Sequence, residues 1–143
     1  MKRRGVALLL AGATALAACA PAGAPPPALW DRLGGHPVVQ RVVDDLLGEV
    51  ATDPLLRPRF IGQNLRSLTA RVVEYLCEQS GGPCRYQGRD LRVAHIGMSI
   101  TAAEWEGFMA GARRAVERNG VPRVEGAELL ALIQSTRNDI VGF

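Results

Sequence analysis

Apolar residues recur along this chain at the three- and four-residue spacing of an α-helix, and no stretch alternates with the period of two that a half-buried strand requires. The broadest apolar face begins after Pro37, a residue that suits the first turn of a helix, and ends at Asp53-Pro54. The pattern predicts an amphipathic helix buried along one wide face. Its inward positions are Val38, Val39, Val42, Val43, Leu46, Leu47 and Val50.

Signals for helix starts and stops divide the middle of the chain. A short first helix over residues 29–33 ends at Gly34-Gly35. A tight turn over residues 55–60 leads to Asn64, which is typical of a helix N-cap. The helix that follows is predicted to turn one stripe inward, made of Leu65, Leu68, Val72, Tyr75 and Leu76.

Two more helices are predicted in the C-terminal half. Thr101 and Glu104 have the spacing of a capping box, which marks a helix start, and Gly120 marks its end. The inward residues of this helix are Trp105, Phe108, Met109 and Ala112. A last helix is predicted over residues 124–140, so the domain is all-α with short connections.

The first eighteen residues have the pattern of a targeting segment. Basic residues at positions 2–4 precede an apolar stretch over 6–18, which is shorter than the ~20 residues that span a bilayer. Leu16-Ala17-Ala18-Cys19 resembles a bacterial lipobox, where the leader is removed and the cysteine is lipid-modified. An ordinary secretory leader cleaved at a nearby small residue is the alternative.

This leader sets the expected domain organisation and location. Residues 1–18 would be a lipoprotein signal peptide, residues 19–28 a Pro/Ala-rich tether, and residues 29–143 one small domain. We expect an exported protein anchored by lipid on Cys19 to the bacterial cell envelope, facing the periplasm. Ala20 is not an acidic inner-membrane retention signal, which favours the outer membrane.

The formal net charge of +3 belongs to the leader. Of the 17 Lys and Arg residues, three lie at positions 2–4, which leaves 14 against 14 Asp and Glu. A neutral domain offers no net basic surface for phosphates, so no nucleic-acid partner is expected.

Two cysteines remain once Cys19 is assigned to the lipid. Cys77 and Cys84 are an even pair in an oxidising compartment, beside the break at Gly81-Gly82-Pro83. A bridge would pin the loop that follows and stabilise the fold by about 2–3 kcal/mol. Two unpaired core thiols are the alternative, and the spacing does not suit a zinc knuckle.

The chain has two histidines, and His95 lies on a short helical segment just before the Thr101 helix start. A single imidazole can hold the iron of a haem from one side, because the porphyrin supplies the four in-plane ligands. The other ring nitrogen is then expected to donate to a backbone carbonyl or a water. A packed or solvated histidine with no ligand role is the alternative.

Five motifs occur in order along the chain, and the last of them contains His95. They are Leu33-Gly34-Gly35-His36, Pro58-Arg59-Phe60-Ile61-Gly62, Gly81-Gly82-Pro83, Tyr86-x-Gly88 and Ala94-His95-x-Gly97-x-x-Ile100-Thr101. Together they resemble the group 1 truncated haemoglobins, over about Leu29 to the last residue. The resemblance implies a two-over-two helical sandwich of the truncated globin type. It also implies haem b as cofactor, with His95 as the axial iron ligand.

The resemblance implies roles for further residues. Phe60 matches a phenylalanine that wedges against the porphyrin face, and Arg71 matches a basic position that can meet a haem propionate. Arg92, one turn before His95, is a second propionate candidate, because a guanidinium fork pairs with carboxylates. Either arginine can instead be an ordinary solvated charge.

The expected distal pocket is apolar. Many relatives place a tyrosine late in the second helix and a glutamine on the third, where this chain has Leu47 and Val72, with Leu68 between them. Without a donor, bound dioxygen loses a hydrogen bond of ~1–3 kcal/mol. We expect weaker oxygen retention, with carbon monoxide and nitric oxide less affected, unless the Tyr75 hydroxyl turns inward.

These inferences favour a protein that reversibly binds diatomic gas over an enzyme. The first alternative is a haem enzyme, a nitric oxide dioxygenase or a peroxidase-like protein, although no distal acid–base residue is evident. The second is a haem-free helical envelope adaptor in which Leu47, Leu68 and Val72 meet the opposite helices directly. A reductant for the iron is an expected but unidentified partner. His36 and Met98 are not expected to bind iron.

Overall fold

The computed structural model describes residues 25–143, so the signal peptide, Cys19 and the tether as far as residue 24 lie outside the described residues. In this part of the chain the structure has α1 (Leu29–Leu33), α2 (Gly35–Val50), the 3₁₀-helix η1 (Arg57–Arg59), α3 (Leu65–Gln79), α4 (Leu91–His95), α5 (Ala102–Arg118), α6 (Arg123–Ser135) and α7 (Arg137–Ile140). Its only β-type pairing is a bridge between Ile100 and Val141. None of the helices described here has the length and apolar character to cross a membrane.

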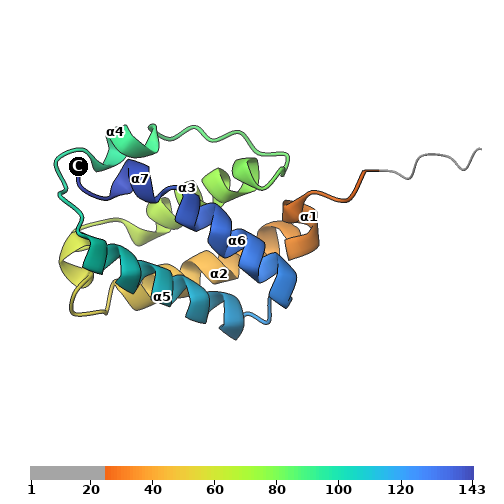
Figure 1. Ribbon diagram of the computed structural model, residues 1–143, viewed down its shortest axis with the longest axis horizontal. Coiled ribbons are helices and arrows are strands. Elements are labelled where there is room, and N and C mark those ends of the chain that lie inside the picture. The colour runs from red at the N-terminus through yellow and green to blue at the C-terminus, as the bar shows by residue number, and fades with distance from the viewer. Residues whose placement is uncertain (1–24) are drawn as a thin grey trace, which may run out of the picture.

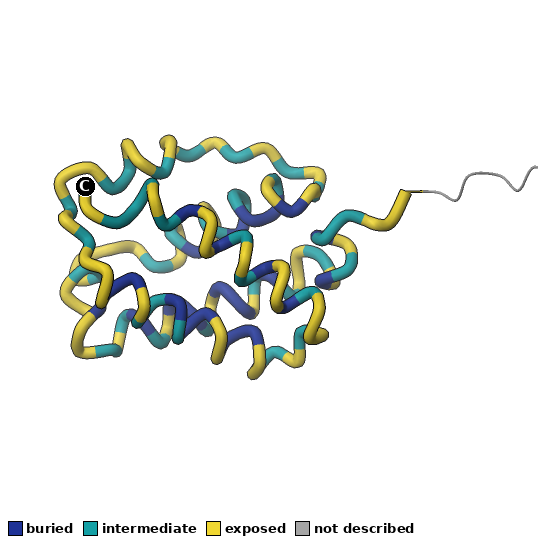
Figure 2. Tube along the Cα trace, viewed as in Figure 1, coloured by how far each residue is buried: buried dark blue, intermediate teal, exposed yellow. Residues whose placement is uncertain are grey.

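Helix α2 is the centre of the core. The inward positions predicted from its apolar stripe are buried, with 1–3% exposure, except for half-buried Val38. The helix packs against both α3 and α5 (Figure 1), and buried segments gather along these three helices (Figure 2). It begins at Gly35, two residues before Pro37, in continuation of the turn that ends α1.

The capping box predicted at Thr101 is present. The Thr101 hydroxyl accepts a hydrogen bond from the backbone nitrogen of Glu104, and the Glu104 carboxylate accepts one from the backbone nitrogen of Thr101 at 2.8 Å. Trp105, Met109 and Ala112 then lie in the core, as the pattern predicts, while Phe108 is half-buried.

The prediction of a single last helix over residues 124–140 is wrong, because the helix is interrupted at Thr136. The Thr136 backbone nitrogen donates to the carbonyl of Ile133, three residues back, and the Thr136 hydroxyl donates to the same carbonyl at 2.7 Å. This tighter turn ends α6 and starts the short α7. Helix α7 then packs against α4, at one edge of the molecule (Figure 1).

A disulfide joins Cys77, at the end of α3, to Cys84 in the following loop, with 5.7 Å between the Cα atoms. Gly82 lies inside this loop without room for a side chain. A Cβ there would lie 2.6 Å from the Cys77 sulfur and 2.8 Å from the Trp30 ring. The backbone nitrogen of Trp30 also donates to Ser80 at 3.0 Å, so the loop is held against α1.

An ion pair joins η1 to the start of α5. The Arg59 guanidinium donates to both carboxylate oxygens of Glu104, at 2.6 and 3.1 Å, and Glu104 also accepts from Thr101. The Glu104 residue is only 7% exposed. The bonds from Arg59 and from the Thr101 backbone outweigh the effect of burial, and they lower the pKa of Glu104 to about 2.

Acid is expected to remove the contribution of this pair to stability. Because the pKa of Glu104 in the folded protein is about 2, below its ordinary 4.5, the contribution is present above pH 4.5 and is lost as the pH falls toward 2. At neutral pH, wild type should exceed Glu104→Gln in free energy of unfolding by about 1–2 kcal/mol, since the one-third exposed Arg59 is partly screened by solvent. Urea denaturation of both proteins measures this difference, and a difference that does not shrink on acidification would contradict the assignment.

Candidate functional site

His95 is the last residue of α4, a helix of five residues. Asp90 caps its N-terminus by accepting a hydrogen bond from the backbone nitrogen of Val93 at 3.2 Å. The helix ends before Gly97, whose φ of +81° is in the left-handed region. No residue of α4 is fully buried, and His95 itself is half-buried.

The hydrogen bond of the imidazole fixes its tautomer. Nδ1 of His95 lies 2.6 Å from the backbone carbonyl of Leu91, one turn earlier in α4. Because a carbonyl oxygen only accepts, Nδ1 must be the protonated nitrogen. Nε2 of the neutral ring then keeps its lone pair, and among residues 25–143 it has no hydrogen-bond partner. This is the arrangement expected of a metal-ligating histidine.

Helix α3 has two apolar lines. The fully buried line is Thr69, Val73, Leu76 and Cys77, and it packs toward α2. The stripe predicted from sequence is displaced from it by about one residue, because its members other than Leu76 are half-buried. Leu68 and Val72 are thus packed against the core without being enclosed by it. The haem-free alternative requires Leu47, Leu68 and Val72 to meet the opposite helices directly. Leu47 is buried, whereas Leu68 and Val72 are only half-buried.

Leu47, the third predicted distal residue, lies deeper. It belongs to α2 and is 3% exposed. It borders an open cleft between α2 and α3 together with Leu65 and Thr69, and its side chain has no hydroxyl or amide to donate a hydrogen bond.

Exposed apolar side chains flank His95 in the sequence, and another follows Phe60. Val93 and Ile96 are 53% and 64% exposed, and Ile61, beside the half-buried Phe60, is 69% exposed. The Arg59 side chain donates to the carbonyl of Met98 at 2.6 Å, so the Phe60 segment lies against the segment that follows His95. The two exposed apolar residues beside the histidine, Val93 and Ile96, are available to contact an apolar partner.

The two predicted propionate arginines have protein partners. Arg71 donates to Glu74 at 2.8 Å, and Glu74 also accepts from the backbone nitrogen of Gln87, which lowers the pKa of the Glu74 carboxyl. The Arg92 guanidinium lies 3.4 Å from Asp139 and 4.3 Å from the ring centre of Phe143. Arg71 is exposed at the surface of α3, whereas Arg92 points to α7. A propionate contact from either stays a prediction.

The remaining candidates have contacts of their own. Tyr75 packs edge-on against Tyr86, with ring centres 5.3 Å apart, and its burial raises the pKa of its hydroxyl. This contact holds the ring toward the loop before α4. His36 is exposed at the start of α2, and half-buried Met98 is held through its backbone.

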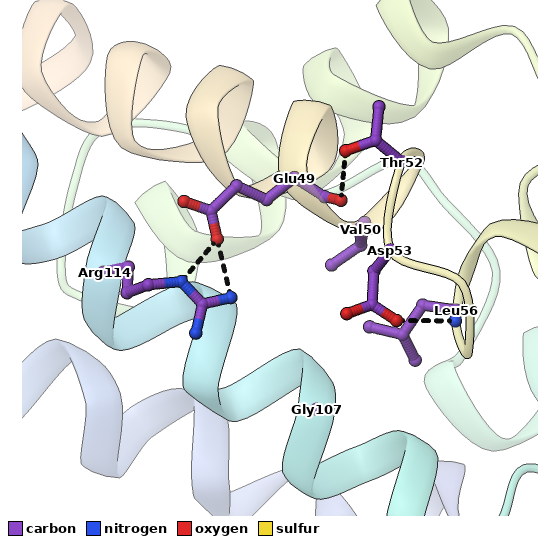
Figure 3. Close-up of a pocket in the computed structure, with 7 residues that line it drawn as sticks. All are labelled: Glu49, Val50, Thr52, Asp53, Leu56, Gly107 and Arg114. Atoms are coloured by element: carbon purple, nitrogen blue, oxygen red, sulfur yellow. Dashed lines mark hydrogen bonds and ion pairs between the residues drawn. The ribbon is translucent and has the colours of Figure 1, made fainter.

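Two open clefts lie away from His95. One lies between the end of α2, the turn after it and α5, and it is bordered by Glu49 and Arg114, which bond at 2.9 Å (Figure 3). The other lies between α2 and α3 and includes Leu47 and Thr69. In the part of the chain that is described, no group of three or more His, Cys, Asp and Glu side chains could hold a metal ion by itself.

Sequence reasoning did not find the bonds from Arg59 to Glu104 and Met98. The capping box was evident, and Arg59 stands directly before Phe60 within a motif. Glu104 and Met98, however, lie 45 and 39 residues after Arg59 in the sequence, and no local pattern links them to it.

Comparison with known proteins gives the same family from sequence and from structure. The model of the Bacterial-like globin family matches residues 28–141. The chain is 32% identical over 110 residues to a group 1 truncated haemoglobin of Nostoc commune, covering 77% of this chain and 91% of that protein. It is 33% identical over 111 residues to one of Mycolicibacterium paratuberculosis, covering 77% and 81%.

Solved structures have the same fold. The truncated haemoglobin of Tetrahymena pyriformis in its Fe(III) form superimposes with a TM-score of 0.77 at 22% identity, covering 82% of this chain and all of that one. The haemoglobin of Chloroflexus aurantiacus gives 0.74 at 23% identity, with the same coverage. The helices described here therefore form the two-over-two sandwich, and the chain belongs to the bacterial-like globins and, among them, to the group 1 truncated haemoglobins.

Proposed function

We propose that residues 29–143 bind haem b with His95 as the axial ligand of its iron, and that the opposite face of the haem binds a diatomic gas reversibly. Membership in a family of haem proteins supports the cofactor. The observation that supports His95 is its hydrogen bond to Leu91, which leaves Nε2 as the basic nitrogen without a partner among the described residues.

The side chains that the proposal assigns to the haem site are largely apolar, as a flat apolar group requires. Leu68 and Val72 present a half-covered apolar stripe on α3, while Val93 and Ile96 flank the histidine with exposed apolar surface. Enclosure of these side chains by a porphyrin would contribute roughly 25 cal/mol for each Å² of apolar surface removed from water. Bound haem would supply iron with one open coordination position for the gas.

The distal residues act by excluding water and by lacking a donor. Leu47, Leu68 and Val72 have purely apolar side chains, so they cannot hydrogen-bond a polarised diatomic ligand. Oxygen, whose bound form gains most from such a bond, is retained less well than in relatives with a distal tyrosine. Carbon monoxide and nitric oxide depend on it less. The same lack of an acid–base group disfavours an enzyme.

We also propose that the globin domain is held at the bacterial envelope by lipid on Cys19. The lipobox-like Leu16-Ala17-Ala18-Cys19 and the Pro/Ala-rich tether support this assignment. The family match begins at residue 28, which is consistent with a leader and tether that are additional to the globin domain.

Replacing the proposed ligand tests the site directly. His95→Ala is expected to abolish the absorption spectrum of a histidine-ligated haem and to lower haem retention. His36→Ala is the matched control, since His36 is exposed at the start of α2 and should leave the spectrum unchanged. Absorption spectra of wild type and both variants after haem addition give the comparison. A wild-type spectrum in His95→Ala would exclude this ligand.

A donor introduced on α2 should slow oxygen release. Leu47→Tyr is expected to lower the oxygen dissociation rate about tenfold, the equivalent of one added hydrogen bond. Leu47→Phe supplies the ring without the hydroxyl and separates donation from bulk. Stopped-flow measurement of oxygen release compares the three proteins. The same rate in Leu47→Tyr and Leu47→Phe would contradict an apolar distal pocket facing Leu47.

Lipid attachment has its own test. The full chain produced in a bacterial host and labelled with a radioactive or clickable fatty acid should carry label in wild type and none in Cys19→Ser. Cys84→Ser is the control for loss of a cysteine elsewhere. Label retained in Cys19→Ser, or absent from wild type, would favour an ordinary secretory leader.

A further inference from the structure

We propose that Arg59 is a positioning residue that fixes α4, and with it His95, relative to Phe60 through a bond network centred on Glu104. The inference rests on the proposed role of His95 as the iron ligand. Arg59 is not placed against the haem in this proposal. It acts through the backbone of the segment that follows the histidine.

The contacts of Arg59 span two separate parts of the chain. Nε and Nη2 bind the two carboxylate oxygens of Glu104, which fixes the plane of the guanidinium. In that plane, Nη1 donates to the carbonyl of Met98 at 2.6 Å, and Nη2 lies 3.5 Å from the carbonyl of Ser99. Arg59 adjoins Phe60, and Met98 is three residues after His95. The Arg59 side chain therefore links the segment of Phe60 to the segment that follows His95.

The segment held in this way has a strained backbone. Ser99 has a φ of +48°, and it is the only residue other than glycine with a positive φ among residues 25–143. Such a conformation persists only when the surroundings hold it. Arg59 lies on one side of it, and on the other the Ser99 nitrogen donates to the carbonyl of Phe143 while Ile100 pairs with Val141.

Core packing does not fix α4 in the absence of these bonds. The helix has no fully buried residue, and its main helical contact is the short α7. Gly97, which follows it, has open space around its Cα and the conformational freedom of glycine. The anchor on the other side is firm, because Glu104 is 7% exposed and is also bound by Thr101. The position of His95 therefore depends on polar contacts, namely those of α4 and the loop with the C-terminal residues and the bond from Arg59 to the loop.

The experiment uses the haem-loaded protein and four variants. Arg59→Met removes the network, and Arg59→Lys keeps the charge without the planar fork. Glu104→Gln keeps a capping-box residue while weakening the anchor, and it serves as a second test if Arg59→Met does not fold. Arg114→Met is the matched control, because it removes an α5 arginine bound to Glu49 in a different part of the fold.

Three properties are measured on each protein. The frequency of the iron–histidine stretching band in resonance Raman spectra reports the geometry of the ligand. The rate of haem transfer to an excess of apomyoglobin reports retention. Hydrogen exchange of the backbone amides over residues 96–100 reports order in the loop, independently of gas binding.

Arg59→Met and Glu104→Gln are expected to shift or broaden the iron–histidine band, to speed haem loss about tenfold and to raise exchange over residues 96–100. Arg59→Lys should fall between them and wild type, and Arg114→Met should match wild type. A wild-type band and haem-loss rate in folded Arg59→Met would overturn the proposal, as would equal changes in Arg114→Met. Absence of an iron–histidine band from wild type would instead refute His95 ligation, and this inference would fall with it.

Discussion

Burial of the α2 face is the constraint around which the domain is arranged. Its valines and leucines are almost fully enclosed, and α3 and α5 supply most of the enclosure. The stripe of α3 that includes Leu68 and Val72 stays half-buried beside this core, and it is the surface on which we propose that the cofactor lies.

The buried core and the proposed iron ligand lie on different elements. The core of α2, α3 and α5 is closed by protein side chains, whereas α4 contributes no fully buried residue. His95 consequently depends on polar bonds for its placement: its own to Leu91, and those that hold the loop after it. Hydrogen bonds are directional, and so they can fix an imidazole more exactly than apolar contact can.

Local patterns were sufficient for much of this arrangement. The α2 face, the box at Thr101 and a carbonyl partner for the imidazole follow from spacing and chemistry within one turn or one helix. The predicted stripe of α3 is displaced by about one residue from the buried line, because spacing alone does not say which of two adjacent lines on one helix is enclosed. The Arg59 network arises from contacts between distant segments. The break at Thr136 is a local turn to the carbonyl of Ile133, which the apolar spacing alone does not reveal. The leader remains a prediction from its sequence.

The disulfide between Cys77 and Cys84 restricts the conformations of the loop that leads to α4. Oxidation restricts that loop in the chain itself, before any prosthetic group arrives. The entropy lost on ordering the loop then does not lower the affinity for the cofactor, so the cofactor binds more tightly. In reducing surroundings the same loop would keep only its non-covalent contacts, such as the bond between Trp30 and Ser80, and more of its ordering would fall to the binding of the cofactor.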